Sequence, residues 1–255
     1  MNKFFSLDVK PEILGSKQAL GAYSDGDLIA DWFAFDLPNG GNLLKEAFMV
    51  TKGTDGTRQT HAVEAYFAKS INGYAPGALG TVHATASGIA SVNQNHLLAF
   101  MTTEEDEDTP TGLDNLTIQR FMYRHGAFKT YGPSPQIVLQ GEPNTGTTKG
   151  YSKLYVALTS IDGAPNFAST VVCDAVQPVG QQFLTVKTTG ARTNFSLGDV
   201  LVDEDDRLLG TIFGDPSSIT NTNIPLDTTG LVNASVDNKD VYSKAPIRLI
   251  LSFER

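Results

Sequence analysis

Short apolar segments, separated by turn residues, constrain the fold of this chain more than any other feature. Residues 27–36, 43–52 and 61–69 each mix apolar and polar positions, and each is followed by a cluster rich in Gly, Pro, Asn or Asp. Segments of about six to ten residues with such turns between them are typical of β-sandwiches and barrels. The nearest approach to a helical pattern lies in residues 84–101, and it lacks a sustained 3.6-residue period with caps at both ends. The sequence therefore predicts an all-β protein.

Length and composition support a folded chain of this class. With 255 residues it can form one large β domain or two modest ones. Charged residues make up 18%, below the usual share of roughly 25%. Because hydrophobic residues reach 40%, the chain can bury enough apolar surface to offset the entropy lost on ordering. Disorder is therefore not expected.

The strand candidates divide the chain into two β regions. Further apolar segments at 116–123, 136–140 and 152–160 bring the count to about eight by residue 175, the number expected of a jelly roll. After residue 181 the segments become shorter, and we expect five of them. Residues 198–212 resemble the opening hairpin of SH3-like barrels.

We therefore predict a jelly-roll-like β-sandwich with a small SH3-like barrel region towards the C-terminus. Residues 1–19 are predicted to form an N-terminal arm, which either reaches a neighbouring subunit or is a disordered end. The apolar run 246–253 either completes the first sheet, making the barrel an insertion, or ends the barrel. The predicted domains are 20–175, possibly completed by 246–253, and 176–245.

The charge of the chain argues against two classes of partner. The net charge is −9 and the sequence pI about 4.8, and the longest acidic run is 104–108. Contact with nucleic-acid phosphates needs clustered Lys and Arg, so no nucleic acid is expected. No stretch approaches the ~18 apolar residues of a membrane span, and no long apolar core of a signal peptide follows Met1. We expect a protein made in a cytoplasm without a membrane partner.

Residues that could carry catalysis are few and scattered. The single cysteine, Cys173, lies in an apolar stretch, where a buried small side chain is favoured over a nucleophile. His61, His83, His96 and His125 show no metal-protease spacing and no Gly-x-Ser-x-Gly elbow accompanies them. No catalytic, cofactor-binding or metal residues are therefore assigned, and the chain is predicted not to be an enzyme.

Three features allow a functional interpretation besides the structural one. The acidic runs 104–108 and 203–206 could hold Ca²⁺ through carboxylate oxygens, although solvated loops are favoured and the ligand spacing of an EF-hand is absent. Trp32, the only tryptophan, is favoured as an anchor of the first sheet over a carbohydrate or subunit contact. Paired carboxylates for glycoside cleavage depend on a separation that the sequence does not give.

Several strings between residues 20 and 172 follow one another in a recurrent order of strands and turns. They are 21–29 (GAYSDGDLI), 40–41 (GG), 43–50 (LLKEAFMV), 63–67 (VEAYF), 154–158 (LYVAL) and 163–170 (GAPNFAST).

Together these strings resemble the jelly-roll structural proteins of bacteriophage virions, of the capsid cement or decoration type. The resemblance rests on order and spacing, because none of the strings is diagnostic alone, and the C-terminal barrel departs from the common pattern. It implies a jelly-roll fold and a place on the virion surface, where such a protein reinforces the capsid. Because open jelly-roll edges would invite uncontrolled pairing, we also expect assembly with the major capsid protein and with copies of the chain itself, as a homotrimer. A tail, baseplate or receptor-binding component that grips host glycans is the first alternative. A glycan-acting enzyme on a β scaffold is the second.

Overall fold

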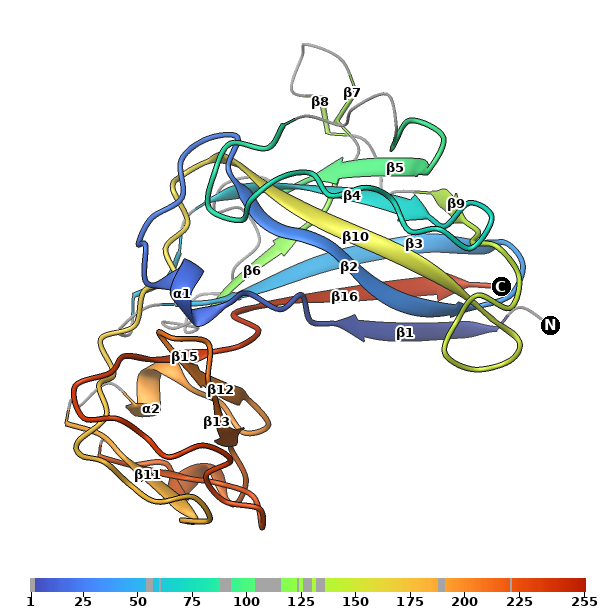
Figure 1. Cartoon of the computed structure of the whole chain (residues 1–255). Coiled ribbons are helices and arrows are strands. Elements are labelled where there is room, and N and C mark those ends of the chain that lie inside the picture. Colours follow the sequence, from blue (N-terminus) through green and yellow to red (C-terminus); the bar gives the residue numbers. More distant parts are fainter. Residues whose placement is uncertain are drawn as a thin grey trace.

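The structure is a computed structural model, which describes residues 3–53, 57–59, 61–87, 93–103, 116–122, 124–125, 130–131, 136–187, 191–220 and 222–255. Strands dominate it, as predicted, and the described strand pairs are antiparallel. The helical elements among these residues are short: α1 (Gly15–Gln18), α2 (Ala191–Asn194) and the 3-10 turn η2 (Pro216–Ser218). Figure 1 shows a sandwich of two sheets with a smaller β unit attached at one end. The all-β prediction is confirmed.

The first sheet of the sandwich contains both ends of the described chain. Its order is β1 (Phe4–Val9), β16 (Ile247–Glu254), β3 (Asn42–Lys52) and β6 (Leu116–Arg120), and β9 (Ile137–Leu139) also pairs with β3. The last strand therefore completes the first sheet, which was one of the two placements left open. The smaller β unit is consequently an insertion ahead of β16 (Figure 1).

The second sheet has the order β2 (Leu28–Pro38), β10 (Tyr151–Asp162), β4 (Ala62–Lys69) and β5 (Leu97–Thr102). Counted along the chain without the short strands, the first sheet holds the first, eighth, third and sixth of eight strands. The second sheet holds the second, seventh, fourth and fifth. This interleaving of eight strands in two sheets is the jelly-roll arrangement. A two-stranded ribbon, β7 (Arg124–His125) with β8 (Thr130–Tyr131), lies outside the two sheets.

Alternation along the strands explains how the two sheets meet. In β16, Leu249, Leu251 and Phe253 are fully or almost fully buried, whereas the residues between them are half-buried. They belong to one core cluster together with Phe67 and Val156 from the opposite sheet. Because side chains of a strand point alternately to the two faces, one face of each sheet forms this core.

The inserted unit is a small closed barrel. One sheet pairs β11 (Phe183–Thr185) with β14 (Asn223–Pro225), and another has the order β13 (Leu208–Thr211), β12 (Val200–Asp203), β15 (Val241–Ser243). Three isolated bridges close the ring: Ile212 to Leu226, Val172 to Asp240, and Cys173 to Val186.

The barrel has six segments in its ring rather than the five expected. The segment around residues 172–173 and β15 take part, and residues 231–232, expected as a strand, do not form one. Its core is a separate cluster that includes Val171, Leu184 and Leu201. Among the described residues, each strand of the ring thus has a neighbouring segment on both sides.

The N-terminal segment differs from the arm that we expected for residues 1–19. Residues Phe4–Val9 form the edge strand β1, because Phe5, Leu7 and Val9 alternate inwards and pack towards the core. The following turn, α1, packs against the barrel strands β12 and β15. No helix of the described residues is long and apolar enough to cross a membrane.

Candidate assembly surfaces

The three histidines with described side chains lie apart and serve local structure. The His83 ring contacts the Tyr23 ring at a tilt of 42°, with centroids 4.3 Å apart, and Nδ1 of His96 lies 2.8 Å from the Lys69 carbonyl oxygen. The side chain of His125 is outside the described residues. No group of three or more His, Cys, Asp or Glu that could hold a metal occurs in the described part of the chain.

His61 is fully buried in the sandwich. Its Nε2 lies 3.3 Å from the hydroxyl oxygen of Thr51, and its Nδ1 has no hydrogen-bond partner among the described residues. Burial lowers the pKa of His61 to about 4, because the charged ring would lose its hydration. His61 is therefore a neutral core residue at physiological pH.

Cys173 and Trp32 also have structural surroundings. Cys173 is buried in the barrel core, and burial raises the pKa of its thiol to about 12, which disfavours a nucleophilic thiolate. Trp32 is half-buried on the outer face of the second sheet, where it packs against a cluster of Leu28 and Leu79. Its indole Nε1 donates a hydrogen bond to the Gly77 carbonyl at 2.9 Å. Trp32 thus fastens a loop over the sheet.

The acidic turn 203–206 lies at the tip of the β12–β13 hairpin, as expected, and its carboxylates have partners within the chain. Asp203 is buried, accepts hydrogen bonds from the backbone N–H of Asp205 and Arg207, and is paired with the Arg207 guanidinium. Glu204 and Asp205 pair with Lys239. The other acidic run, 104–108, lies outside the described residues.

The last carboxylate of this turn joins the barrel to the N-terminal segment. Asp206 accepts two hydrogen bonds from Ser16, at 2.9 Å from the backbone N–H and 2.7 Å from the hydroxyl. The approach is close: a Cβ on Gly15 would lie 2.1 Å from the Asp203 carbonyl oxygen. Glycine at position 15 is therefore required for α1 to contact the hairpin.

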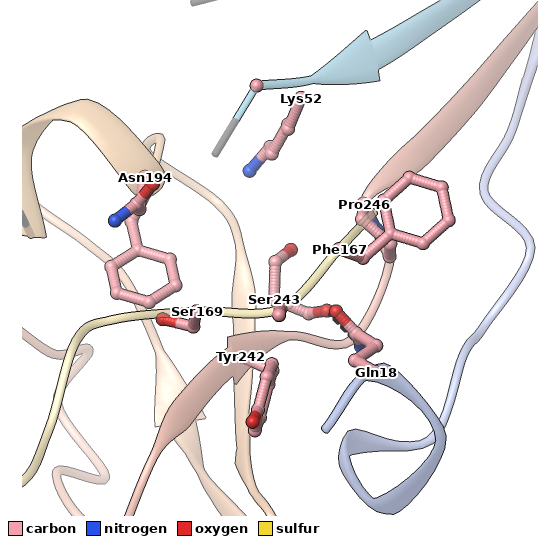
Figure 2. Close-up of a pocket in the computed structure, with 11 residues that line it drawn as sticks. Gln18, Lys52, Phe167, Ser169, Asn194, Tyr242, Ser243 and Pro246 are labelled. Carbon is pink, nitrogen blue, oxygen red and sulfur yellow. Dashed lines mark hydrogen bonds between the residues drawn. The ribbon is translucent and has the colours of Figure 1, made fainter. Parts of the chain in front are cut away.

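A small hollow marks the rest of the junction between sandwich and barrel (Figure 2). It has a volume of about 30 Å³, and polar residues (Gln18, Lys52, Asn194, Ser243) and apolar ones (Phe167, Phe195, Pro246) line it together. The Gln18 amide donates to the carbonyl oxygens of Ile13 and Ser243, at 2.9 Å each. The side chains around this hollow therefore help to hold the barrel against the sandwich.

An ion pair crosses the same junction. Lys52 at the end of β3 is paired with Asp199 of the barrel, and both side chains are mostly buried. Burial and the nearby charge of Lys10 lower the pKa of the Lys52 amine, whereas the Asp199 carboxylate favours the charged amine. A second pair joins Lys244 to Glu12 at 2.8 Å. The barrel is thus held at a defined place on the sandwich.

Two strands at the lower side of the sandwich in Figure 1 leave backbone groups open. β1 pairs with β16 alone, and β2 pairs with β10, among the described residues. The loop of residues 77–86 contacts β2 from Leu28 to Trp32. The Leu28 N–H donates to the Ala84 carbonyl at 2.9 Å, the Leu79 N–H donates to Asp31 Oδ1 at 3.2 Å, and the Trp32 indole donates to the Gly77 carbonyl. The opposite edge strands, β5 and β6, adjoin segments outside the described residues. Among the described residues on this side of the sandwich, the open strand edges are therefore β1 and the part of β2 after Trp32.

The hydrogen-bond ladder between β1 and β16 shows which backbone groups of β1 point away from the sheet. Lys3 and Arg255 exchange both backbone hydrogen bonds, at 3.0 and 2.9 Å. In an antiparallel pair such exchanges recur at every second residue, so the N–H and C=O groups of Phe4, Ser6 and Asp8 point away from β16. Phe4 is also 71% exposed, whereas Asp8 is paired with Arg248 at 2.7 Å. The Phe4 end of β1 is consequently the least protected edge.

Sequence reasoning missed two sets of surface residues. No sequence motif predicts the junction contacts of Gly15, Ser16 and Gln18. Phe183 and Phe213 are exposed on the barrel. Each is next to an apolar residue that points into the core. Because neighbouring side chains of a strand point to opposite faces, two consecutive apolar residues in a short strand could have indicated that one of them is exposed.

Comparison with known proteins adds no relative: no family model, no curated protein and no solved structure matches this chain.

Proposed function

We propose that the chain is a virion structural protein, a capsid cement or decoration protein that stabilises the head through contacts between subunits. The observation that carries the proposal is the open side of the sandwich formed by β1 and β2. An unpaired edge with an exposed aromatic residue invites pairing with another chain, and folded proteins normally cover or charge such edges. Assembly with sister copies covers it in a controlled way.

The strand order and the charge pattern support this proposal. The strings that resemble phage virion proteins lie in β3, β4 and β10 of the jelly-roll sandwich, at the start of β2, and in adjoining turns. A net charge of −9 disfavours packaged DNA as the partner and leaves protein surfaces as the alternative. The proposed partners are the major capsid protein and copies of the chain, arranged as a homotrimer.

Location and copy number in purified particles test the proposal. A symmetric reconstruction of the virion should show this chain in many copies related by icosahedral symmetry, on the capsid surface. A few copies confined to the tail would assign it to the tail or baseplate instead. Its absence from purified virions would refute a structural role in the particle.

A proline at Ser6 tests the role of the β1 edge in trimer formation. The Ser6 N–H points away from β16, so Ser6→Pro removes a donor from the open edge without breaking the β1–β16 ladder. Ser6→Ala is the matched control, because it keeps that N–H. Light scattering should show trimers for the wild type and the Ala variant and a shift to monomers for the Pro variant. Trimers in all three would show that β1 is not the contact.

A further inference from the structure

The barrel exposes a group of apolar side chains. They are six of the fourteen large hydrophobic residues exposed in the described part of the chain, although the barrel is the smaller unit. Large apolar patches on a folded surface mark interaction sites, whereas scattered single residues do not. The six residues, named here the barrel patch, are Val176, Val179, Phe183, Leu208, Phe213 and Val232.

Hydrogen bonds show that the segments carrying the barrel patch adjoin one another. Phe183 pairs with Pro225, and the Phe213 N–H donates to the Pro225 carbonyl at 3.2 Å, so both rings flank one proline. The Val232 N–H donates to the Leu209 carbonyl at 2.8 Å, next to Leu208. Residues 180–181 exchange hydrogen bonds with Leu231, which places Val179 near Val232. In Figure 1 β11 lies at the far side of the barrel from the sandwich.

Three acidic residues border the barrel patch. Asp174 precedes Val176, Asp215 follows Phe213, and Asp227 follows Pro225, and none of the three is in an ion pair among the described residues. The cations that flank the same segments are already used: Arg207 pairs with Asp203 and Lys187 with Asp237. The border of the patch is therefore negative.

This charge pattern decides between two kinds of occupant. Two copies that met through the same patch would bring like carboxylates together, which disfavours the contact. A different protein with an apolar surface bordered by Lys or Arg would fit both the apolar centre and the acidic border. Phosphate-rich surfaces are disfavoured by the same negative charge.

We propose that the barrel patch is the surface by which this chain docks onto a second, different protein, whose contact surface is apolar with a basic border. The inference rests on the proposed structural role and names the surface used: the sandwich edges join sister copies, and the barrel binds the capsid protein beneath them.

Rebinding to particles tests the proposal. The probe is the virion of the encoding virus, purified from a deletion mutant that lacks this chain. The variant Phe183→Ser/Phe213→Ser should bind at least about a hundredfold more weakly than the wild type, because burial of each ring contributes about tenfold or more to association. Tyr74→Ser, at an even more exposed aromatic position on the sandwich, should bind as the wild type does. Circular dichroism and thermal unfolding establish that each variant is folded.

Charge reversal tests the basic border of the partner. Asp174→Lys should weaken binding to the depleted particles, and added salt should weaken wild-type binding. Unchanged or stronger binding by Asp174→Lys would overturn the assignment of a basic partner.

Three results distinguish failure of the barrel-patch proposal from failure of the proposed function. Wild-type binding by Phe183→Ser/Phe213→Ser would overturn the barrel patch and leave the proposed function standing. Loss of self-association in this variant, with particle binding unchanged, would make a second copy the occupant and overturn the proposed partner. Failure of the wild-type chain itself to bind depleted particles would overturn both proposals.

Discussion

Acid should destabilise this protein through His61, and the size of the effect can be worked out from its burial. The pKa of His61 is about 4 in the folded chain, against 6.5 when the ring is hydrated. Since the folded pKa is the lower one, the unfolded chain binds the proton first as the pH falls. Stability from the neutral ring is complete above pH 6.5 and is lost between pH 6.5 and 4. The gap between the two pKa values corresponds to about 3 kcal/mol.

Urea unfolding at a series of pH values measures this loss. His61→Gln removes the titrating group. Between pH 6.5 and pH 4, the free energy of unfolding of this variant should therefore fall by about 3 kcal/mol less than the free energy of unfolding of the wild type. His96→Gln is the matched control, because it removes a histidine without emptying the core, and it should retain the wild-type loss.

A direct titration of the ring by NMR keeps the test decisive even if His61→Gln folds poorly. A His61 pKa near or above 6 would refute the reasoning from burial. An equal loss of stability in His61→Gln and the wild type would assign the acid sensitivity to other groups, such as the paired carboxylates.

Three further predictions concern the barrel and its junction. Gly15→Ala should lower the free energy of unfolding by about 1–3 kcal/mol, because the added Cβ would overlap the Asp203 carbonyl. Thermal unfolding measures the loss, and a smaller shift would show that α1 can move away from the hairpin freely. Cys173 should resist alkylation at pH 8 in the folded chain and react once it is unfolded in urea, and rapid native labelling would contradict its burial. In a double-mutant cycle of unfolding free energies, the effects of Lys52→Met and Asp199→Asn should be coupled by about 1–3 kcal/mol, because the two side chains form an ion pair. Additive effects of the two substitutions would argue against the ion pair.

The class of the fold followed from local chemistry in the sequence. Apolar runs of strand length between Gly, Pro, Asn and Asp turns allow few alternatives to paired strands, because a strand buries one face and a turn must end it. The hairpin of β12 and β13 could be expected for the same reason, since the acidic turn 203–206 separates two apolar segments. The burial of Cys173 likewise followed from its apolar neighbours.

Long-range pairing was decided only by the tertiary structure. The alternation of Phe5, Leu7 and Val9 allowed a strand, yet its place beside β16 depends on residues more than 230 positions away. The position of β16 in the first sheet, and hence the insertion of the barrel, depends in the same way on its register with β3. Local patterns determine which segments become strands, but the partner of each strand depends on which arrangement buries all faces at once.

The surfaces proposed for assembly have the same origin. A sequence shows that Phe4, Phe183 and Phe213 are apolar, and it does not show which of them the core leaves outside. That depends on how two sheets and a closed ring of short strands share the available apolar residues. Composition and turn spacing therefore determined the β class by themselves. The open edges, the junction and the barrel patch exist only because segments distant in sequence pack together.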